Sequence, residues 1–263
     1  MYAFAYERPT SMADALAKIS AGGQALAGGQ TLIASLKQRL AQPESLIDLA
    51  GVAELSGIRK EGNTLVIGAM TRHETVADSA EVQAAIPALA ALAGGIGDRQ
   101  VRAMGTLGGS VANNDPAACY PSAVLGLGAT VQTNKRSIAA DDYFQGMYTT
   151  ALEEGELITA IHFPVPLKAA YAKFRQPASR FALVGVFVAQ TASGVRVAIT
   201  GAGNGVFRHA GLEAALTKSF TPEAVEGVTI DPGELNSDLH ASAAFRAQLI
   251  KVQIQKAVRQ ANG

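Results

Sequence analysis

Two glycine-containing stretches, about eighty residues apart, decide how this chain is interpreted. They read Leu26-Ala27-Gly28-Gly29-Gln30-Thr31-Leu32 and Gly105-Thr106-Leu107-Gly108-Gly109-Ser110-Val111-Ala112-Asn113-Asn114-Asp115-Pro116. Glycine has no Cβ and reaches turn conformations in which amide groups converge, so a phosphate can approach the main chain closely. A helix that follows such a turn directs its free amides and the positive end of its dipole at the same anion.

The two stretches together predict a diphosphate site, because hydroxyls accompany the glycine amides in both. These hydroxyls belong to Thr31, Thr106 and Ser110. Neither stretch matches the G-x-G-x-x-G or G-x-x-x-x-G-K-[ST] pattern, which argues against a Rossmann or P-loop site. From spacing alone, two ordinary Gly-Gly turns remain the alternative.

Composition indicates a globular protein with no strong electrostatic field. The chain has 263 residues, 48% of them hydrophobic and 17% charged, and its 22 basic and 22 acidic residues give a formal net charge of zero. Nucleic acid is therefore not an expected partner, whereas association with other subunits is favoured. No apolar run approaches the length of a membrane span, and the N-terminus lacks the pattern of an export signal, so a cytoplasmic location is expected.

The cysteine and histidine content restricts the chemistry further. A single cysteine, Cys119, excludes an intrachain disulfide, a multi-cysteine zinc site and a four-thiolate iron-sulfur cluster. Four histidines are scattered without metal-ligand spacing, and surface or capping roles are expected for them: His73, His162, His209 and His240. The sequence therefore predicts no metal site and no catalytic residue.

The pattern of elements predicts an α+β protein rather than a regular doubly wound sheet. A helix should begin after Ser11, and a second should carry Leu32, Ile33, Leu36 and Leu40 on one stripe. Pro87 should interrupt a helix over residues 79–93, and Pro164 with Pro166 marks the clearest boundary. Beyond it, the β-rich runs 182–190 and 195–200 should form a hairpin. The last helix should present one strong apolar stripe of Phe245, Leu249 and Val252, with Ile250, Ile254 and Val258 alongside.

The same motifs resemble those of a known family, the FAD-binding medium subunits of molybdenum hydroxylases. This family includes subunits of xanthine dehydrogenases, and its type member belongs to aerobic carbon monoxide dehydrogenase. Both glycine stretches match in order and separation, the first followed by Leu46-Ile47-Asp48-Leu49 and the second preceded by Asp98-Arg99-Gln100-Val101-Arg102. Further matches are Gly155-Glu156-Leu157-Ile158-Thr159, Tyr171-Ala172-Lys173-Phe174-Arg175 and Ala243-Ala244-Phe245-Arg246. The resemblance spans nearly the whole chain.

The resemblance implies a vanillyl-alcohol-oxidase-like (PCMH-type) FAD-binding fold. Two α/β lobes, residues 1–55 and 56–165, would hold FAD in the cleft between them, and residues 168–263 would form a C-terminal α+β domain. The residues implied around the pyrophosphate and ribityl chain are Ala27, Gly28, Gly29, Gln30, Thr31, Leu32, Thr106, Gly108, Gly109 and Ser110, with Asn114 and Asp115 continuing that wall. Ile96 and Ile158 would border the isoalloxazine, and Arg175 would lie near the ring, although core packing for the isoleucines and a solvated arginine remain open.

Two positions depart from the family pattern. Cys119 stands where these proteins usually carry Asp, which removes a hydrogen bond worth about 1 kcal/mol of FAD affinity. No histidine is close to it in sequence, so an inert buried thiol is expected. Arg180 stands where similar proteins often carry Asp.

The function implied is electron transfer within a larger complex. Such a subunit would take electrons from the [2Fe-2S] clusters of a small partner subunit and pass them to an external acceptor, while a large molybdopterin subunit oxidises the substrate. A dimer of such heterotrimers is the expected assembly. Two alternatives remain, a self-contained flavin oxidoreductase acting on a small molecule and a non-catalytic scaffold subunit.

Overall fold

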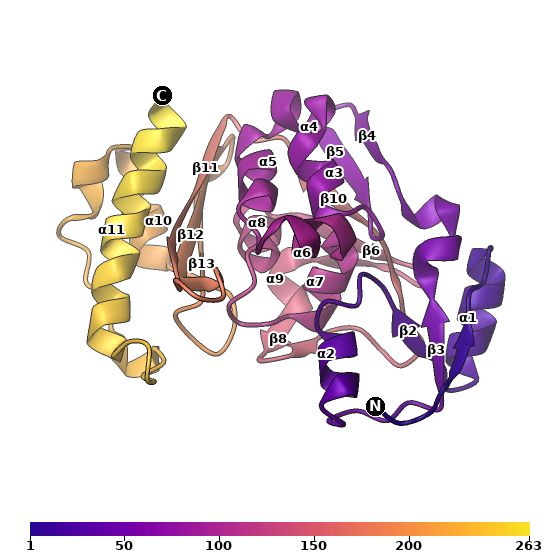
Figure 1. The fold of residues 1–263 in the computed structure, drawn as a ribbon. Coiled ribbons are helices and arrows are strands. Elements are labelled where there is room, and N and C mark those ends of the chain that lie inside the picture. Colours follow the sequence, from indigo (N-terminus) through magenta and orange to yellow (C-terminus); the bar gives the residue numbers. More distant parts are fainter.

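Three main sheets follow one another along the chain in the computed structural model, which describes all residues 1–263 (Figure 1). The first is parallel, and its strands lie in the order β1 (Ala5–Glu7), β3 (Ser45–Asp48) and β2 (Gln24–Leu26). Helices α1 (Met12–Ser20) and α2 (Leu32–Lys37) follow β1 and β2. As expected, Ser11 caps α1, because its hydroxyl accepts the amide proton of Asp14 at 3.2 Å.

The second sheet is antiparallel and has five strands. Their order is β4 (Ile58–Glu61), β5 (Thr64–Gly68), β10 (Ile158–Pro164), β6 (Thr130–Thr133) and β7 (Ser137–Ala139). Six helices separate β5 from β6, namely α3 (His73–Asp78), α4 (Ala80–Ala85), α5 (Pro87–Gly94), α6 (Arg99–Met104), α7 (Leu107–Asn113) and α8 (Tyr120–Gly126). The predicted interruption at Pro87 is confirmed, since α4 ends at Ala85 and α5 begins at the proline.

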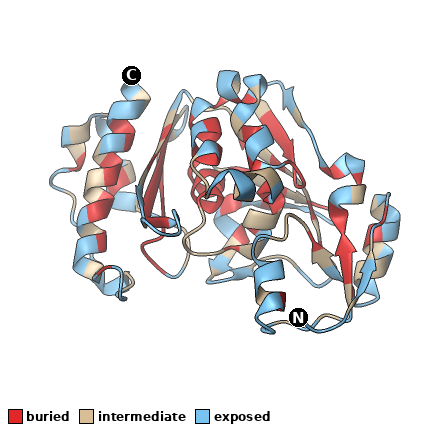
Figure 2. Ribbon diagram, viewed as in Figure 1, coloured by how far each residue is buried: buried red, intermediate tan, exposed pale blue.

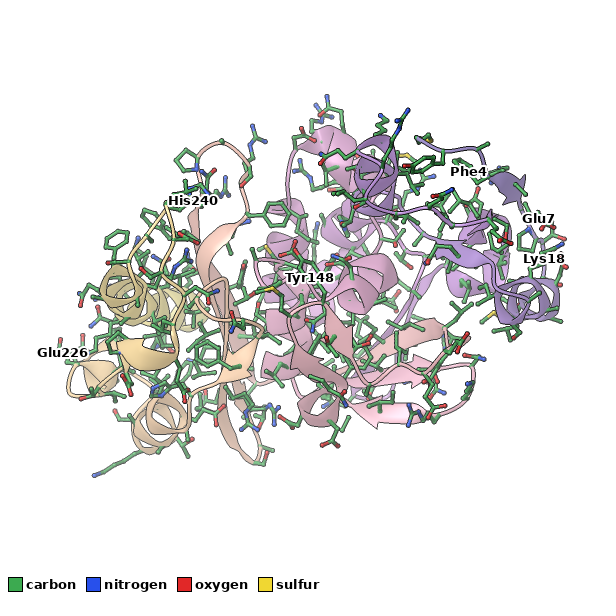
Figure 3. The ribbon with its side chains drawn as sticks, turned by 90° about the horizontal axis from the view of Figure 1, so that it is seen from below. Phe4, Glu7, Lys18, Tyr148, Glu226 and His240 are labelled. Atoms are coloured by element: carbon green, nitrogen blue, oxygen red, sulfur yellow. The ribbon has the colours of Figure 1, made fainter.

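Short elements complete this part of the chain. They are α9 (Ala140–Tyr143), the hairpin of β8 (Phe144–Gly146) and β9 (Thr149–Thr150), and the 3-10 turns Leu49–Gly51 and Ala53–Leu55. Tyr148, at the tip of the β8–β9 hairpin, is labelled in Figure 3. Near the N-terminus, Lys18 of α1 forms an ion pair with Glu7 of β1, also labelled there.

The third sheet is buried on both faces. Its strands are β11 (Lys168–Arg175), β12 (Ala182–Thr191), β13 (Gly194–Thr200) and β14 (Phe207–Arg208), followed by α10 (Ala210–Lys218), the 3-10 turns Pro222–Val225 and Pro232–Glu234, and α11 (Ala243–Asn262). Phe187 and Ala198 pack into the same core as α5 and α8, whereas Val186 and Val197 face α11. Figures 1 and 2 show this sheet between the two groups of helices, with β12 and β13 buried along most of their length.

The structure confirms the α+β class and corrects two expected stripes. Helix α2 ends at Lys37, and Leu40, three residues further on, is 76% exposed instead of continuing the apolar face. In α11 the expected stripe is buried at Leu249, Ile250, Ile254 and Val258, and the correction concerns Phe245, which is 46% exposed. Among all the helices, none combines the length and apolarity that crossing a bilayer requires.

Candidate functional site

The two glycine stretches lie against each other in the folded chain. A Cβ built on Gly28 would come within 2.3 Å of the carbonyl oxygen of Met104 and 2.6 Å of the Cα of Gly105. A Cβ on Gly109 would stand 3.1 Å from the Cβ of Ala27. Only residues without a side chain permit this approach of one main chain to another. The fold therefore joins two segments that are about eighty residues apart in sequence.

The first stretch presents a row of unsatisfied main-chain donors. None of the five amide groups of residues 28–32 donates a hydrogen bond within the protein. Gly29 has a φ of +70°, which bends the chain at this point into a conformation that glycine adopts freely. The hydroxyl of Thr31 also has no partner, because this residue begins α2 without a side-chain cap. Gln30 and Thr31 are exposed and the other three residues are half-buried, so this stretch lies at the surface.

The second stretch differs from the expectation, because its amides are already used. The Leu107 and Gly108 amides donate to the carbonyls of Thr71 and Ala69 at 3.0 and 2.8 Å, and the Gly109 amide donates to the side-chain oxygen of Thr106 at 3.2 Å. Thr106 is thus the N-cap of α7, and it is buried. The start of α7 is docked and capped rather than open to an anion. What this stretch still offers is hydroxyl groups, including that of Ser110.

A buried histidine supports the second stretch from behind. His73 donates its amide to the carbonyl of Gly105 at 2.9 Å, and a Cβ on Gly105 would lie 2.5 Å from its ring nitrogen Nε2. Burial, with a smaller contribution from the Arg102 charge, lowers the pKa of His73 to about 4, so its ring is neutral at pH 7. The expected surface or capping role is therefore wrong for His73, although His209 does cap α10 through Nδ1.

Asn114 and Asp115 turn the chain at the end of α7 and fix the neighbouring hairpin. Asn114 adopts a left-handed conformation with a φ of 44°, and its side-chain amide donates to the carbonyls of Gly146 and Thr149 at 2.8 and 2.9 Å. One carboxylate oxygen of Asp115 accepts the Ala117 amide proton at 2.8 Å. The Asn114 amide protons are therefore committed to the protein, and its carbonyl oxygen Oδ1 is buried without a partner.

The remaining expected site residues lie in different surroundings. Ile96 is half-buried in the loop between α5 and α6, against the large core. Ile158, at the start of β10, is only 6% exposed and belongs to that core, so it does not present an open wall. Arg175 is exposed at the end of β11. The structure thus brings the two glycine stretches together, and it separates Ile158 from the exposed surface.

Cys119 and Arg180, the two residues that depart from the family pattern, both contact Lys173, for which the sequence predicted no role. Lys173 of β11 places its ammonium nitrogen 3.4 Å from the sulfur of Cys119 and 3.0 Å from the carbonyl oxygen of Arg180. Cys119 is a free, buried thiol, as expected. Lys173 lies on a strand, but the residues that it contacts come from distant segments, so no local sequence signal indicates these contacts.

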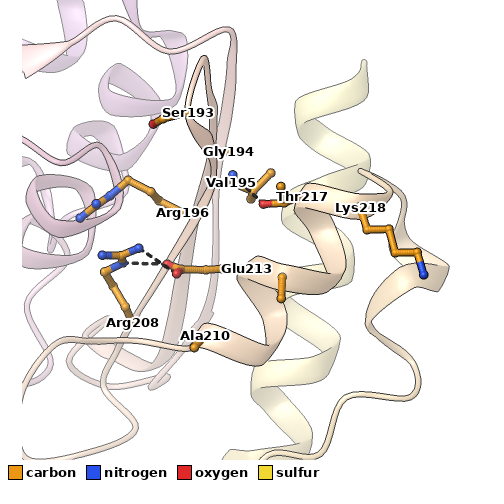
Figure 4. A pocket seen from close by; sticks show the side chains of 10 residues that line it. Ser193, Gly194, Val195, Arg196, Arg208, Ala210, Glu213, Thr217 and Lys218 are labelled. Atoms are coloured by element: carbon orange, nitrogen blue, oxygen red, sulfur yellow. Dashed lines mark hydrogen bonds and ion pairs between the residues drawn. The ribbon is translucent and has the colours of Figure 1, made fainter.

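A pocket of about 490 Å³ lies elsewhere, between β13 and α10 (Figure 4). Two of its charged groups pair with each other, since the Arg208 guanidinium donates to both oxygens of Glu213 at 2.8 Å, and Arg208 also donates to Asp141, outside the lining, at 3.1 Å. Its lining contains no residue of either glycine stretch. This pocket is therefore separate from the candidate site.

Comparison with known proteins agrees with the geometry. Residues 2–166 match the family model described as the FAD binding domain in molybdopterin dehydrogenase. The carbon monoxide dehydrogenase medium chain of Afipia carboxidovorans is 37% identical over 281 residues, covering 98% of this chain and 96% of the relative. The nicotine 6-hydroxylase medium subunit of Paenarthrobacter nicotinovorans is 33% identical, covering 98% and 97%.

Solved structures give the same result over the full length. Reconstituted CO dehydrogenase from Oligotropha carboxidovorans matches with a TM-score of 0.88 and 33% identity, covering 99% of this chain and 98% of that chain. Quinoline 2-oxidoreductase from Pseudomonas putida 86 matches with a TM-score of 0.90 and 28% identity, covering 99% and 97%. The chain therefore belongs to the FAD-binding medium subunits of molybdenum hydroxylases and is an oxidoreductase subunit.

Proposed function

We propose that residues 28–32 hold the diphosphate of FAD and that the second glycine stretch braces them from behind. The observation that carries this proposal is the run of five unused amides beside the contact between Gly28 and Met104. A diphosphate needs several hydrogen-bond donors, and amides can supply them without a basic side chain. The cradle therefore fits the cofactor of the family.

The expected site residues take different parts in this arrangement. Ala27 through Leu32 supply main-chain donors and the Thr31 hydroxyl, and Thr106 and Ser110 add hydroxyls. Gly109 permits close contact between the two stretches, and Gly108 permits α7 to dock against Ala69. Asn114 and Asp115 act indirectly, because their polar atoms fix the β8–β9 hairpin and the turn after α7. Ile96 borders the ring and the exposed Arg175 lies near it, whereas Ile158 belongs to the hydrophobic core.

The function supported best is transfer of electrons between partner subunits and an external acceptor. FAD, when bound, supplies the carrier of electrons, and this chain's own residues bind it, orient it and leave part of it accessible. One cysteine cannot hold a [2Fe-2S] cluster, so the clusters belong to a small partner subunit and the molybdopterin to a large one. We place the complex, a dimer of heterotrimers, in the cytoplasm.

Isolation of the chain and of its native complex tests the proposal. The full-length protein should be yellow, with FAD bound close to one per chain, and the native complex should contain a smaller iron-sulfur subunit and a larger molybdopterin subunit. A colourless protein that does not take up added FAD would contradict the cofactor site. Turnover of simple substrates by the isolated chain would favour a self-contained flavin oxidoreductase instead.

A further inference from the structure

Three cationic side chains from three segments converge on the loop between α5 and α6. The carbonyl oxygens of residues 95, 96 and 97 each accept a hydrogen bond from one of these side chains. Lys173 Nζ donates to the first at 2.8 Å, Arg102 Nη1 to the second at 2.9 Å, and Arg180 Nη1 to the third at 3.3 Å. We call Arg102, Lys173 and Arg180 the cationic cluster.

No carboxylate neutralises the cationic cluster. None of its three members forms an ion pair with an aspartate or glutamate. The nearest acid in sequence, Asp98, instead caps α6 by accepting the Val101 amide proton at 2.9 Å. In a chain whose net charge is zero, this places an excess of positive charge at one loop.

The arrangement brings like charges close together. Arg102 Nη1 and Arg180 Nη1 both donate to the carbonyl oxygen of Gly97, each at 3.3 Å, so the two nitrogens lie within about 6.6 Å of each other. Two guanidinium groups at this separation repel each other, and an anion between or beside them offsets this repulsion. The geometry therefore favours the binding of a negative group.

The two arginines still have donors to offer such a group. Hydrogen bonds within the protein use only the Nη1 atom of each guanidinium, and Nε and Nη2 remain free on both. Arg180 is exposed, so a ligand in solution can reach it. Paired N–H groups in a rigid plane match the spacing of oxygens in carboxylate, sulfonate and phosphate groups.

The cationic cluster lies next to the proposed FAD cradle. Helix α6, which carries Arg102, ends at Met104, and the Met104 carbonyl is the atom that Gly28 approaches. The loop it surrounds contains Ile96, the residue proposed to border the flavin ring. Resting on the proposed function, we propose that the cationic cluster binds an oxyanion group carried by the external electron acceptor and so selects acceptors that are negatively charged.

A matched pair of acceptors tests this selectivity. The holoprotein would be photoreduced without oxygen and mixed with a naphthoquinone sulfonate or with the parent naphthoquinone. Each quinone takes up two electrons and two protons and becomes a hydroquinone, and the flavin returns to its oxidised state. The readout is the ratio of the two second-order rate constants. We expect Arg180→Asn and Arg102→Gln each to lower this ratio about tenfold at low salt, because a local cation accelerates the approach of an anion.

The variants are chosen to separate charge from folding. Asn tolerates the left-handed backbone of Arg180, whose φ is 63°. Arg259→Gln is the control. Arg259 is exposed near the end of α11 and does not belong to the cationic cluster, so the loss of its charge should leave the ratio unchanged. Added salt should reduce the wild-type ratio more than the ratio of either cluster variant, because screening weakens an electrostatic preference.

A binding measurement distinguishes this proposal from the cofactor site. Redox-inert naphthalenesulfonate, titrated calorimetrically into the chain with or without FAD, should bind the wild type and lose about tenfold in affinity in Arg180→Asn. FAD affinity should stay the same in that variant. Unchanged sulfonate binding and an unchanged ratio would overturn the proposal. A fall in FAD affinity with an unchanged ratio would also overturn it, by assigning the cationic cluster to the phosphates of FAD. A chain that binds the sulfonate but no FAD would instead contradict the proposed function.

Discussion

Gly29 shows how a single backbone conformation can control the cofactor site. Its φ of +70° bends the first stretch, in which none of the amides of residues 28–32 is bonded within the protein. A Cβ at this position would lie 2.6 Å from the end of the Ile33 side chain, not in the open space beside the amides. A larger residue at this position would meet both the backbone strain and the contact with Ile33. The main chain would move to relieve them, and the substitution would act through that movement.

Gly29→Ala should therefore weaken FAD binding about tenfold, the loss expected when one amide donor is displaced. A titration of FAD into the FAD-free protein, followed by flavin fluorescence, measures this change. The control is Gly62→Ala in the β4–β5 turn. Gly62 has a φ of 58° and open space around its Cβ position, so the backbone strain is comparable. Equal losses of FAD affinity in both variants would show that general destabilisation, not the turn at Gly29, is responsible.

Thr106 allows the cap of α7 to be tested separately. Thr106→Val keeps the shape of the side chain and removes the oxygen that accepts the Gly109 amide proton. We expect a loss of about 1 kcal/mol in the free energy of unfolding, together with weaker FAD binding, and Thr106→Ser should restore both. Urea unfolding and FAD titration provide the measurements. Thr31→Val is the matched comparison, because Thr31 makes no capping bond and its loss should change stability by under about 0.5 kcal/mol.

Residues whose roles depend on long-range contacts were the least predictable. The glycine pairs and the Ser11 cap leave local signals, because turns and helix starts depend on neighbouring residues. His73 and Lys173 leave none, since one is placed by Gly105 and the other by Gly95, Cys119 and Arg180. The order of the motifs predicted which residues would form the site, and the two glycine stretches do lie against each other. It could not predict that the amides of Leu107 and Gly108 would already be bonded, because their acceptors belong to the segment after β5.

At the scale of elements, one buried carboxylate ties the β6–β7 turn to the segment before β10. The side chain of Glu156 is fully buried, and it accepts hydrogen bonds from Thr133 at 2.7 Å, from the Glu153 amide at 2.8 Å and from Arg136 at 3.0 and 3.1 Å. The bonds from Arg136, followed by those from Glu153 and Thr133, outweigh burial and lower the pKa of Glu156 from 4.5 to about 2.

This shift predicts a specific dependence of stability on pH. Because the pKa is lower in the folded state, the stabilisation is fully present above about pH 4.5 and is lost as the pH falls towards 2. Glu156→Gln should lower the free energy of unfolding by about 2 kcal/mol at pH 7 and flatten its decline in that acidic range. Urea unfolding at several pH values tests this. Glu223→Gln, at an exposed glutamate without an ion pair, should leave the slope unchanged.

At the scale of the whole molecule, the three expected parts of the chain are not independent of one another. Each of the three main sheets lies within one of the expected parts, residues 1–55, 56–165 and 168–263, but the hydrophobic core extends across the second boundary. Phe187, Ala189 and Ala198 of the third sheet pack with residues of α5 and α8. The Gly201 amide also donates to the Pro116 carbonyl at 2.8 Å. The residues that match the FAD-binding family model therefore depend on the C-terminal part for some of their core.

A fragment of residues 1–166 should accordingly fold poorly. Removing β12 and β13 exposes the apolar faces of α5 and α8, so the fragment should bind a hydrophobic dye and unfold with low cooperativity. Fluorescence with such a dye and thermal unfolding followed by circular dichroism would test this. Coexpression with residues 167–263 should restore cooperative unfolding. A fragment as stable as the full chain would show that the shared core contributes little.

The contact between Gly28 and the end of α6 limits how this site can be moved to another protein. Its donors lie on one segment and the surface that supports them lies on another, so neither segment contains a functional unit. Grafting residues 26–32 alone into a different scaffold would transfer the loop without the support that sets its curvature. A transplant would require residues 69–110 as well, as a second piece placed at the same distance and angle.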